Sequence, residues 1–193
     1  MLSILVPVYN QEIVALAATL VDACKKAEVR YEILFGEDGS SAEWIDTNSS
    51  VKQLDSVEHL VFKDNRGRSA IRNTLASLAK FECLLFLDAD SQLTGSSFIA
   101  DYLKLQDRYP VISGGRVYTA HPPQDKLLRL HWKYGSSRNQ NLQGLATHSP
   151  INPFIPTTLL FVVKSYVTIR SMKKSANMDM RIRYGRCHFS AQA

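Results

Sequence analysis

The first half of the chain shows a repeating pattern of short apolar runs and longer amphipathic segments. The apolar runs have the length and composition of buried strands, and the longer segments carry apolar residues at helical spacing. Strands that alternate with such helices indicate an α/β protein with a mostly parallel central sheet, covered by helices on both faces in the Rossmann-like manner. The predicted strands are residues 2–8, 31–35, 57–62 and 83–87, and the predicted helices are residues 12–28 and 67–80.

The other parts of the chain are less regular. The stretch Gly-Glu-Asp-Gly-Ser at residues 36–40 predicts a turn after the second strand, and residues 42–54 predict a polar helix or loop. From Ser171 onward there are few periodic apolar positions and many bases, which predicts a poorly packed tail. The remaining predicted elements are helices at residues 96–109 and 127–140 and strands at residues 111–118 and 157–163.

Length and charge add two constraints. A chain of 193 residues with 45% apolar composition is large enough to bury a core as one globular unit. Its net charge is +5, and much of the excess lies in the last quarter of the chain. Such a bias suits an anionic partner such as phosphate, nucleic acid or a lipid headgroup, although a solvated basic tail explains it equally well.

Cysteine usage and hydropathy favour a cytoplasmic protein. Cys24, Cys83 and Cys187 are an odd number without CxxC spacing, so neither a disulfide framework nor a zinc ribbon is indicated. The amino-terminal apolar run breaks at Pro7, which is too early for a signal peptide or an anchor. No other stretch approaches the ~20 apolar residues of a spanning helix, so we expect at most a peripheral attachment at the inner face of the membrane.

Acidic and amide side chains follow three of the predicted strands: Asn10, then Glu37 and Asp38, then Asp88 and Asp90. Ligands of open parallel sheets bind beyond the carboxyl ends of the strands. Asp88 and Asp90 would share a face in an extended backbone, and two like charges so close need a cation. Mg²⁺ or Mn²⁺, bound by carboxylates plus substrate phosphates, meets that need. The pair therefore predicts a metal and diphosphate site, with a solvated turn as the alternative.

Two arginines precede the acidic strand end. Arg68 and Arg72 are four residues apart on the predicted helix 67–80, so they project from one side of it. From there they would clamp a phosphate or pair with the acids. The alternative is that they are ordinary surface arginines.

Four segments together resemble the inverting GT-A glycosyltransferases of the family-2 type. They are SILVPVYN (residues 3–10), EDGS (37–40), NRGRSAIRN (65–73) and LLFLDADS (84–91), and their order and spacing match the nucleotide half of that family. The resemblance implies a GT-A fold in a single domain, residues 1–193. Residues 1–120 would be the nucleotide-sugar-binding half and residues 121–193 a partial acceptor half.

The resemblance also implies roles for individual residues. In this family the acid pair after the second strand hydrogen-bonds the nucleobase and ribose, and the last acid of the DxD motif binds the metal on the diphosphate. Here Glu37 stands where the family commonly has aspartate, which leaves the choice of nucleobase open. By this match Pro7 and Tyr9 would line the base and ribose pocket, Glu37 and Asp38 would be the acid pair, Asp88 would face the ribose, Arg68 and Arg72 would hold the nucleotide pocket, and Asp90 would bind the metal.

The carboxyl-terminal segment departs from the family. Family members commonly carry a Glu-Asp pair whose carboxylate deprotonates the acceptor hydroxyl, but this chain has Cys187 and His188 where the pair is expected. No carboxylate follows Asp179. Three explanations remain: a truncated or frameshifted relative, which the aperiodic tail favours; a base supplied by Asp179 or His188; or a protein that binds a sugar nucleotide without transferring it.

The sequence thus leads to one favoured function and one alternative. The favoured function is metal-dependent transfer of a sugar, with inversion, from a nucleoside diphosphate to a glycan or lipid-linked acceptor, as in polysaccharide biosynthesis. Without the usual base such an enzyme would be impaired, because general-base catalysis typically contributes ~10²–10⁴-fold. The alternative is a sugar-nucleotide-binding module without turnover. A nucleic acid is not among the expected partners.

Overall fold

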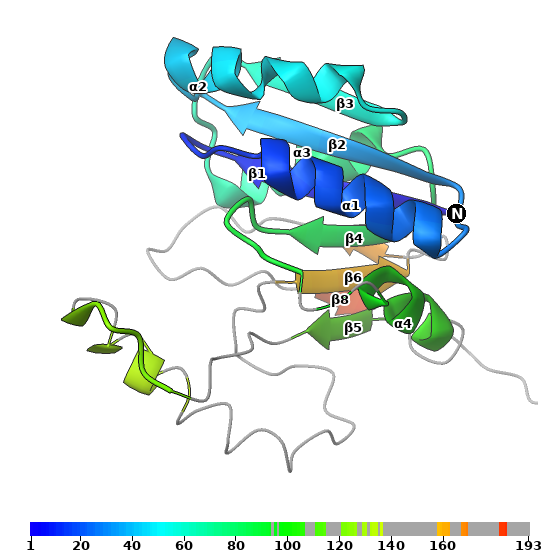
Figure 1. Ribbon diagram of the computed structural model, residues 1–193. Coiled ribbons are helices and arrows are strands. Elements are labelled where there is room, and N and C mark those ends of the chain that lie inside the picture. Colours follow the sequence, from blue (N-terminus) through cyan, green and yellow to red (C-terminus); the bar gives the residue numbers. More distant parts are fainter. Residues whose placement is uncertain are drawn as a thin grey trace, which may run out of the picture.

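A six-stranded sheet is the framework of the protein in the computed structural model (Figure 1). The structure describes residues 1–93, 95, 97–106, 111–114, 121–126, 129, 130, 132–134, 136, 158–162, 167–169 and 182–184. The elements in chain order are β1 (Leu2–Val8), α1 (Val14–Lys26), β2 (Tyr31–Asp38), α2 (Ala42–Asn48), the 3₁₀ turn η1 (Ser49–Gln53), β3 (Val57–Phe62), α3 (Arg68–Leu78), β4 (Cys83–Leu87), α4 (Phe98–Leu105), β5 (Val111–Gly114), β6 (Thr158–Val162), β7 (Val167–Ile169) and β8 (Ile182–Tyr184).

The strand order in the sheet is β3-β2-β1-β4-β6-β5. Strands β1 to β4 are parallel to their neighbours among these four, whereas β6 is antiparallel to both β4 and β5. The prediction of a mostly parallel sheet is therefore confirmed. Because β1, β2 and β4 are parallel neighbours, their carboxyl ends lie at one edge of the sheet.

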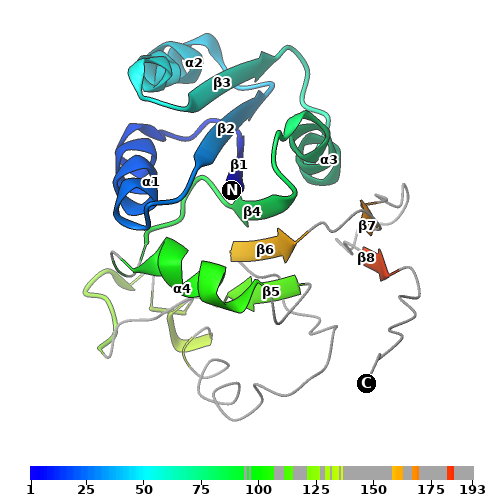
Figure 2. The same cartoon turned by 90° about the vertical axis from the view of Figure 1, so that its right-hand side faces the viewer.

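Helices cover both faces of the sheet, as predicted (Figure 2). Side chains alternate between the two faces of a strand, so each strand contributes to two separate cores. On one face Ile4 and Ile33 pack in the core that includes residues of α1 and α4, and on the other Leu5 and Leu34 pack against Ile71 of α3. Helices α1 and α3 are thereby fixed on opposite sides of the same strands.

Strand β2 is longer than its sequence predicts. The prediction of a turn at residues 36–40 is wrong for residues 36–38. There β2 continues to Asp38 and pairs with strands on both sides. Gly36 is needed here for space and not for a turn, since a Cβ would lie 2.9 Å from Leu75 Cδ2 of α3. The chain turns at Gly39, where φ is +77° and a Cβ would lie 2.5 Å from the backbone nitrogen of Asn65.

Most other predicted elements are confirmed with small shifts of their ends. The predicted bounds of β1, β3 and β4 match the observed strands, and α1, α3 and α4 are each shorter than predicted. Of the strand predicted at residues 157–163, the structure describes Thr158–Val162 as β6. Residues 42–54 form α2 followed by η1. The strand predicted at residues 111–118 corresponds to β5 (Val111–Gly114), and residues 115–118 lie outside the described residues. Most of the predicted helix 127–140 and of the tail after Ser171 lies outside the described residues, and the division at residue 120 stays a prediction.

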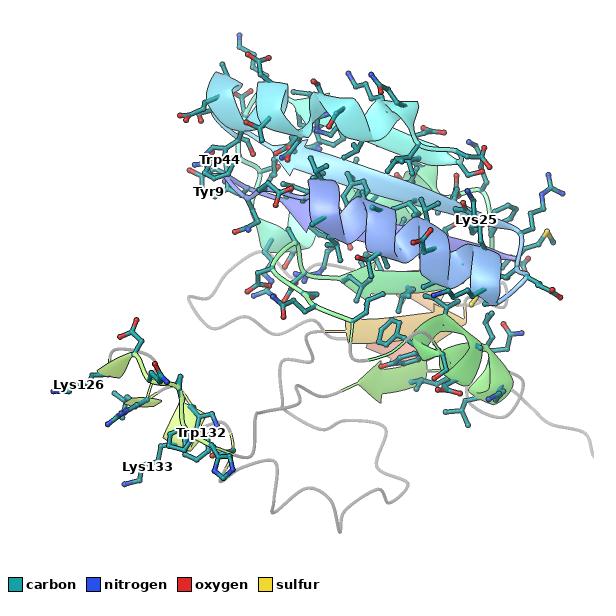
Figure 3. All side chains as sticks on the ribbon, viewed as in Figure 1. Tyr9, Lys25, Trp44, Lys126, Trp132 and Lys133 are labelled. Atoms are coloured by element: carbon teal, nitrogen blue, oxygen red, sulfur yellow. The ribbon has the colours of Figure 1, made fainter. Side chains whose placement is uncertain are left out.

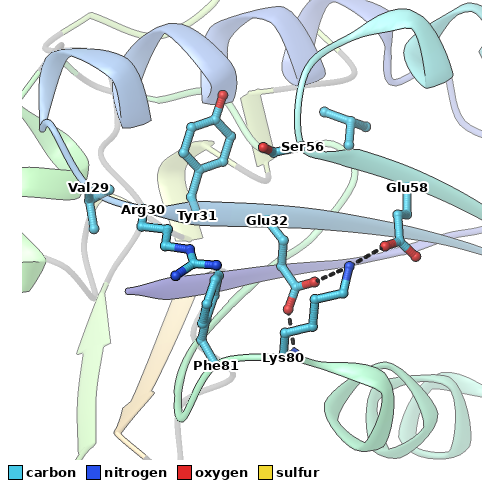
Figure 4. A pocket seen from close by; sticks show the side chains of 9 residues that line it. Val29, Arg30, Tyr31, Glu32, Ser56, Glu58, Lys80 and Phe81 are labelled. Carbon is cyan, nitrogen blue, oxygen red and sulfur yellow. Dashed lines mark hydrogen bonds and ion pairs between the residues drawn. The ribbon is translucent and has the colours of Figure 1, made fainter.

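At the amino ends of β2 and β3 the protein has a cavity of about 370 Å³ (Figure 4). The buried carboxylate of Glu32 lies beside it, accepting hydrogen bonds from Ser3 Oγ at 2.6 Å and from the backbone nitrogen of Lys80. Lys80 Nζ lies 3.4 Å from Glu32 Oε2 and 2.6 Å from Glu58 Oε1. These contacts raise the pKa of Lys80, with the hydrogen bond to Glu58 as the main cause. Ser3 and Lys80 thus join the ends of β1 and α3 to Glu32.

No helix in the described part of the chain is both long enough and apolar enough to span a bilayer.

Candidate functional site

The carboxyl edge of the sheet gathers the residues that the sequence singled out. Tyr9 follows β1, Asp38 ends β2 and Asp88 follows β4, and these three strands are neighbours in the sheet. Tyr9 is 57% exposed, and Figure 3 shows it at the same edge as Trp44 of α2. The expected convergence of strand ends at one edge is therefore observed.

Asp88 is held between two arginines of α3. Arg68 Nη2 donates to Asp88 Oδ2 at 2.7 Å, and Arg72 Nη2 donates to Oδ1. Residues four apart lie on one side of a helix, so both guanidinium groups reach the same carboxylate. Of the alternatives left open by the sequence, pairing with an acid is the one observed. This triad of Arg68, Arg72 and Asp88 has a formal charge of +1.

The two arginines differ in their surroundings. The Arg72 side chain is 11% exposed, whereas that of Arg68 is 37% exposed. Burial lowers the pKa of Arg72, an effect opposed by the negative charge of Asp88 and reinforced by Arg68. Arg72 is thus the inner partner of Asp88, and Arg68 presents more of its charge to solvent.

The backbone turns directly after β4. The Ser91 amide donates to the Asp88 carbonyl at 3.0 Å, which closes a tight turn over these residues. The expectation that Asp88 and Asp90 share the face of an extended strand is therefore wrong, because the chain leaves the ladder at Leu87. Asp88 points toward α3, and Asp90 is exposed and makes no side-chain hydrogen bond or ion pair with another described residue.

Asp38 fixes the beginning of α3. Its Oδ1 accepts from the Arg66 amide and its Oδ2 from the Gly67 amide, each at 3.0 Å. Arg66 and Gly67 directly precede Arg68, the first residue of α3, so the buried carboxylate anchors the backbone that leads into the helix. Asp38 thereby sets where Arg68 begins the helix. Its predicted contact with a nucleotide stays a prediction.

Glu37 points to the other face of the sheet. Its Oε1 accepts from Asn48 Nδ2 at 2.8 Å and is 3.1 Å from His59 Nε2, and its Oε2 accepts from Ser40 Oγ. The side chains of Glu37 and His59 are both 0% exposed. Adjacent strand residues face opposite ways, which explains why the acid pair is divided. The predicted contact of Glu37 with a nucleobase stays a prediction, and in this arrangement the carboxylate is enclosed by protein.

The sequence pattern did not predict His59 and Asn48 as site residues. His59 lies in a strand predicted from its apolar residues, and Asn48 lies in a segment predicted only as a polar helix or loop. One signal was available for His59. It is two residues from the buried Val57, so strand alternation places it on the core face, where a polar ring requires a partner.

The segment after β1 carries Tyr9 outward. Asn10 has φ +49°, its amide donates to Ser40 Oγ at 3.0 Å, and its Oδ1 accepts from the Ser41 amide at 2.9 Å. The site residue Pro7 is partly buried within β1, opposite Gly36 of β2. The loop beside Tyr9 is therefore tied to the loop after β2.

A divalent ion would find few protein ligands here. The described residues contain no group of three or more His, Cys, Asp or Glu side chains arranged to hold a metal. Mg²⁺ and Mn²⁺ commonly take one or two carboxylates and leave other positions to water and substrate phosphates. The exposed Asp90 fits that pattern as a single protein ligand.

The predicted base cannot be placed beside these groups. Asp179 and His188 lie outside the described residues.

Comparison with known proteins points to one family. The model of the family described as "Glycosyl transferase family 2" matches residues 3–164. A search of the curated proteins found no match.

Solved structures share the fold. TarS residues 1–349 from S. aureus, crystallised with UDP-GlcNAc, has a TM-score of 0.53 and 18% identity, covering 65% of this chain and 37% of that one. The mannosyltransferase PcManGT from Pyrobaculum calidifontis, in complex with GDP-Man and Mn²⁺, has a TM-score of 0.57 and 18% identity, covering 83% of this chain and 44% of that one. The chain thus spans less than half the length of these solved proteins. At such identity the likeness shows the fold, which is GT-A.

Proposed function

The chain belongs to glycosyl transferase family 2, and we propose that it binds a nucleoside-diphosphate sugar with Mn²⁺ or Mg²⁺ and transfers the sugar to an acceptor hydroxyl with inversion. The observation that carries this proposal is the arrangement of Arg68, Arg72 and Asp88 beside the exposed Asp90 at the carboxyl edge of the sheet. Ligands of such sheets bind at this edge.

The diphosphate would lie between Asp90 and the start of α3. The triad has one more positive than negative charge, and the beginning of a helix adds a partial positive charge. Asp90 is the residue that would hold the metal, whose chemistry is to offset charge that develops on the leaving diphosphate. The complex of the P. calidifontis enzyme with GDP-Man and Mn²⁺ supports this choice of cofactor.

The nucleoside would lie toward Tyr9. An exposed aromatic ring offers a surface for stacking of a base. Each oxygen of Asp88 accepts from one arginine, and a carboxylate has about four lone-pair positions in all, so Asp88 retains capacity for a ribose hydroxyl. The related structures with UDP-GlcNAc and GDP-Man make UDP and GDP the nucleotides to test first.

Transfer with inversion requires a direct attack of the acceptor hydroxyl on the anomeric carbon and a base that takes its proton. Asp179 is the residue that we propose as this base, with His188 as the other candidate. The acceptor would be a glycan or a lipid-linked glycan. A lipid-linked acceptor would place the protein in the cytoplasm at the inner face of the membrane, where the basic residues of the tail would assist.

A second function, binding of a sugar nucleotide without transfer, is favoured by one observation: Cys187 and His188 stand where the family commonly carries its Glu-Asp pair. Calorimetry with UDP and GDP, each with and without Mn²⁺, tests binding, and a transfer assay with UDP-GlcNAc and GDP-Man tests turnover. Metal-dependent binding with transfer or donor hydrolysis supports the enzyme. Binding without either reaction supports the module, and no binding of either nucleotide contradicts both.

A further inference from the structure

A buried polar network lies beneath the loop that carries Tyr9. It is built from Glu37 of β2, Ser40, Asn48 of α2 and His59 of β3, and it ends on the backbone of residues 10–13. The nucleotide contacts implied by the family resemblance include Glu37 but neither His59 nor Asn48.

The chemistry of the network follows from its donors. Glu37 receives Asn48 Nδ2 and Ser40 Oγ and faces His59 Nε2, so it acts only as an acceptor, which is the role of an ionised carboxylate. His59 must then donate through Nε2. Its Nδ1 is buried without a hydrogen-bond partner among the described residues, so Glu37 is the one side chain that the His59 ring contacts by a hydrogen bond there. His59 is therefore a dedicated donor to Glu37.

The network holds the segment after β1 at both ends. At one end, Ser40 Oγ donates to Glu37 and accepts the Asn10 amide at 3.0 Å. At the other, Asn48 Oδ1 accepts the Ile13 amide at 3.0 Å and Nδ2 donates to the Gln11 carbonyl at 2.8 Å. The orientation of this segment, and of Tyr9 just before it, thus depends on Ser40 and Asn48, which are not among the nucleotide contacts that the family resemblance implies.

We infer that His59 and Asn48 are positioning residues for donor binding. His59 acts through Glu37 and Ser40, and Asn48 acts through its own hydrogen bonds to the backbone of Gln11 and Ile13, so that together they fix the segment that presents Tyr9 to the nucleoside. This inference rests on the proposed function. It also accounts for glutamate at position 37, because the longer side chain reaches His59 of β3 and Asn48 of α2 together.

Two measurements test the inference on the full chain. The first is hydrogen exchange of the Asn10 and Ser41 amides, which needs no nucleotide. The second is the Kd of UDP and of GDP with Mn²⁺, measured by calorimetry. The variants are His59→Leu, which removes the donor; His59→Gln, which keeps one; and Ser40→Ala, which cuts the link to Asn10 at a partly exposed position and is expected to fold. Glu32→Gln is the matched control, because it alters a buried carboxylate network at the opposite end of the sheet.

We expect His59→Leu and Ser40→Ala to speed exchange at Asn10 and Ser41 and to raise the nucleotide Kd about tenfold, whereas His59→Gln stays within about threefold of the parent. Glu32→Gln should change neither quantity. If Ser40→Ala and folded His59→Leu keep the protection of both amides, the network does not hold the segment and the inference is overturned. Lost protection with an unchanged Kd also overturns it, because positioning would then not serve the donor. If the parent protein binds neither nucleotide, the proposed function fails, while exchange still decides whether the network holds the segment.

Discussion

At both ends of the sheet, ion pairs connect a strand to α3 or to a residue just after it, but the net charges of the two clusters differ in sign. At the carboxyl end Asp88 joins β4 to the beginning of α3 through Arg68 and Arg72. At the amino end Glu32 of β2 meets Lys80, just after α3, and Lys80 also contacts Glu58. Each end therefore locks the same helix to the sheet through a carboxylate that is largely removed from solvent.

The difference lies in the charge that remains. The cluster of Arg68, Arg72 and Asp88 has a formal charge of +1, whereas the cluster of Lys80, Glu32 and Glu58 has a formal charge of −1. Arg30, which lines the same cavity and lies over the Phe81 ring at 5.7 Å, adds a positive charge beside the second cluster. Paired charges are thus enough to hold α3 against the sheet. The additional positive charge of the Arg68, Arg72 and Asp88 cluster, close to Asp90, is what suits a metal-bound diphosphate.

The largest expected effect comes from Asp90→Ala. Loss of the proposed metal ligand should weaken Mn²⁺-dependent nucleotide binding by about a hundredfold or more, equivalent to ~2.7 kcal/mol. The melting temperature should barely change, because Asp90 is exposed. Calorimetry with and without Mn²⁺ measures the effect, and Asp22→Ala, an exposed acid on α1, is the control. Undiminished affinity in the Asp90 variant would contradict the site.

Arg72→Ala should affect both binding and stability. It leaves the partly buried Asp88 with only its more exposed partner, which should cost about 2 kcal/mol of unfolding free energy and raise the nucleotide Kd about tenfold. Urea denaturation and calorimetry measure the two effects. Full stability in this variant would mean that Arg68 alone satisfies Asp88.

Glu32→Gln should affect stability alone. The amide keeps one acceptor oxygen for Ser3 and the Lys80 backbone but loses the charge facing Lys80 Nζ. We expect a loss of about 1 kcal/mol in the free energy of unfolding, with an unchanged nucleotide Kd. Urea denaturation reports the former. A weaker nucleotide affinity would show that the two ends of the sheet are coupled through α3.

The smallest effect is expected for Arg68→Ala. This arginine is more exposed than Arg72, so its ion pair is screened by solvent and should contribute only ~0.5 kcal/mol to stability. Nucleotide affinity should fall about threefold, and the fall should be smaller at high salt. Calorimetry at low and high salt checks both points. An effect larger than that of Arg72→Ala would reverse the order of the two partners of Asp88.

Much of the fold was predictable because it depends on local pattern. The apolar runs of β1, β3 and β4 and the helical spacing of α1 and α3 are visible in the chain, and parallel pairing follows from their alternation. The end of β2 was not predictable in this way. Gly36 and the residues after it have turn composition, but ladder bonds on both sides and the close approach of Leu75 keep them in the strand.

The candidate site was predictable in composition but not in its contacts. The positions of Asp88, Asp90, Arg68 and Arg72 along the chain are enough to indicate an edge of the sheet that carries both acids and bases. Their pairing was not indicated, because the turn that separates Asp88 from Asp90 depends on where β4 leaves the sheet.

The sequence by itself determined the order of strands and helices, the family resemblance and the set of polar residues at the strand ends, because each of these follows from residue type and spacing along the chain. The tertiary structure alone decided that Asp38 faces the start of α3 while Glu37 faces His59 and Asn48. The physical reason is that strand alternation sends neighbouring acids to opposite faces, and the partners on each face come from distant segments that only folding brings together.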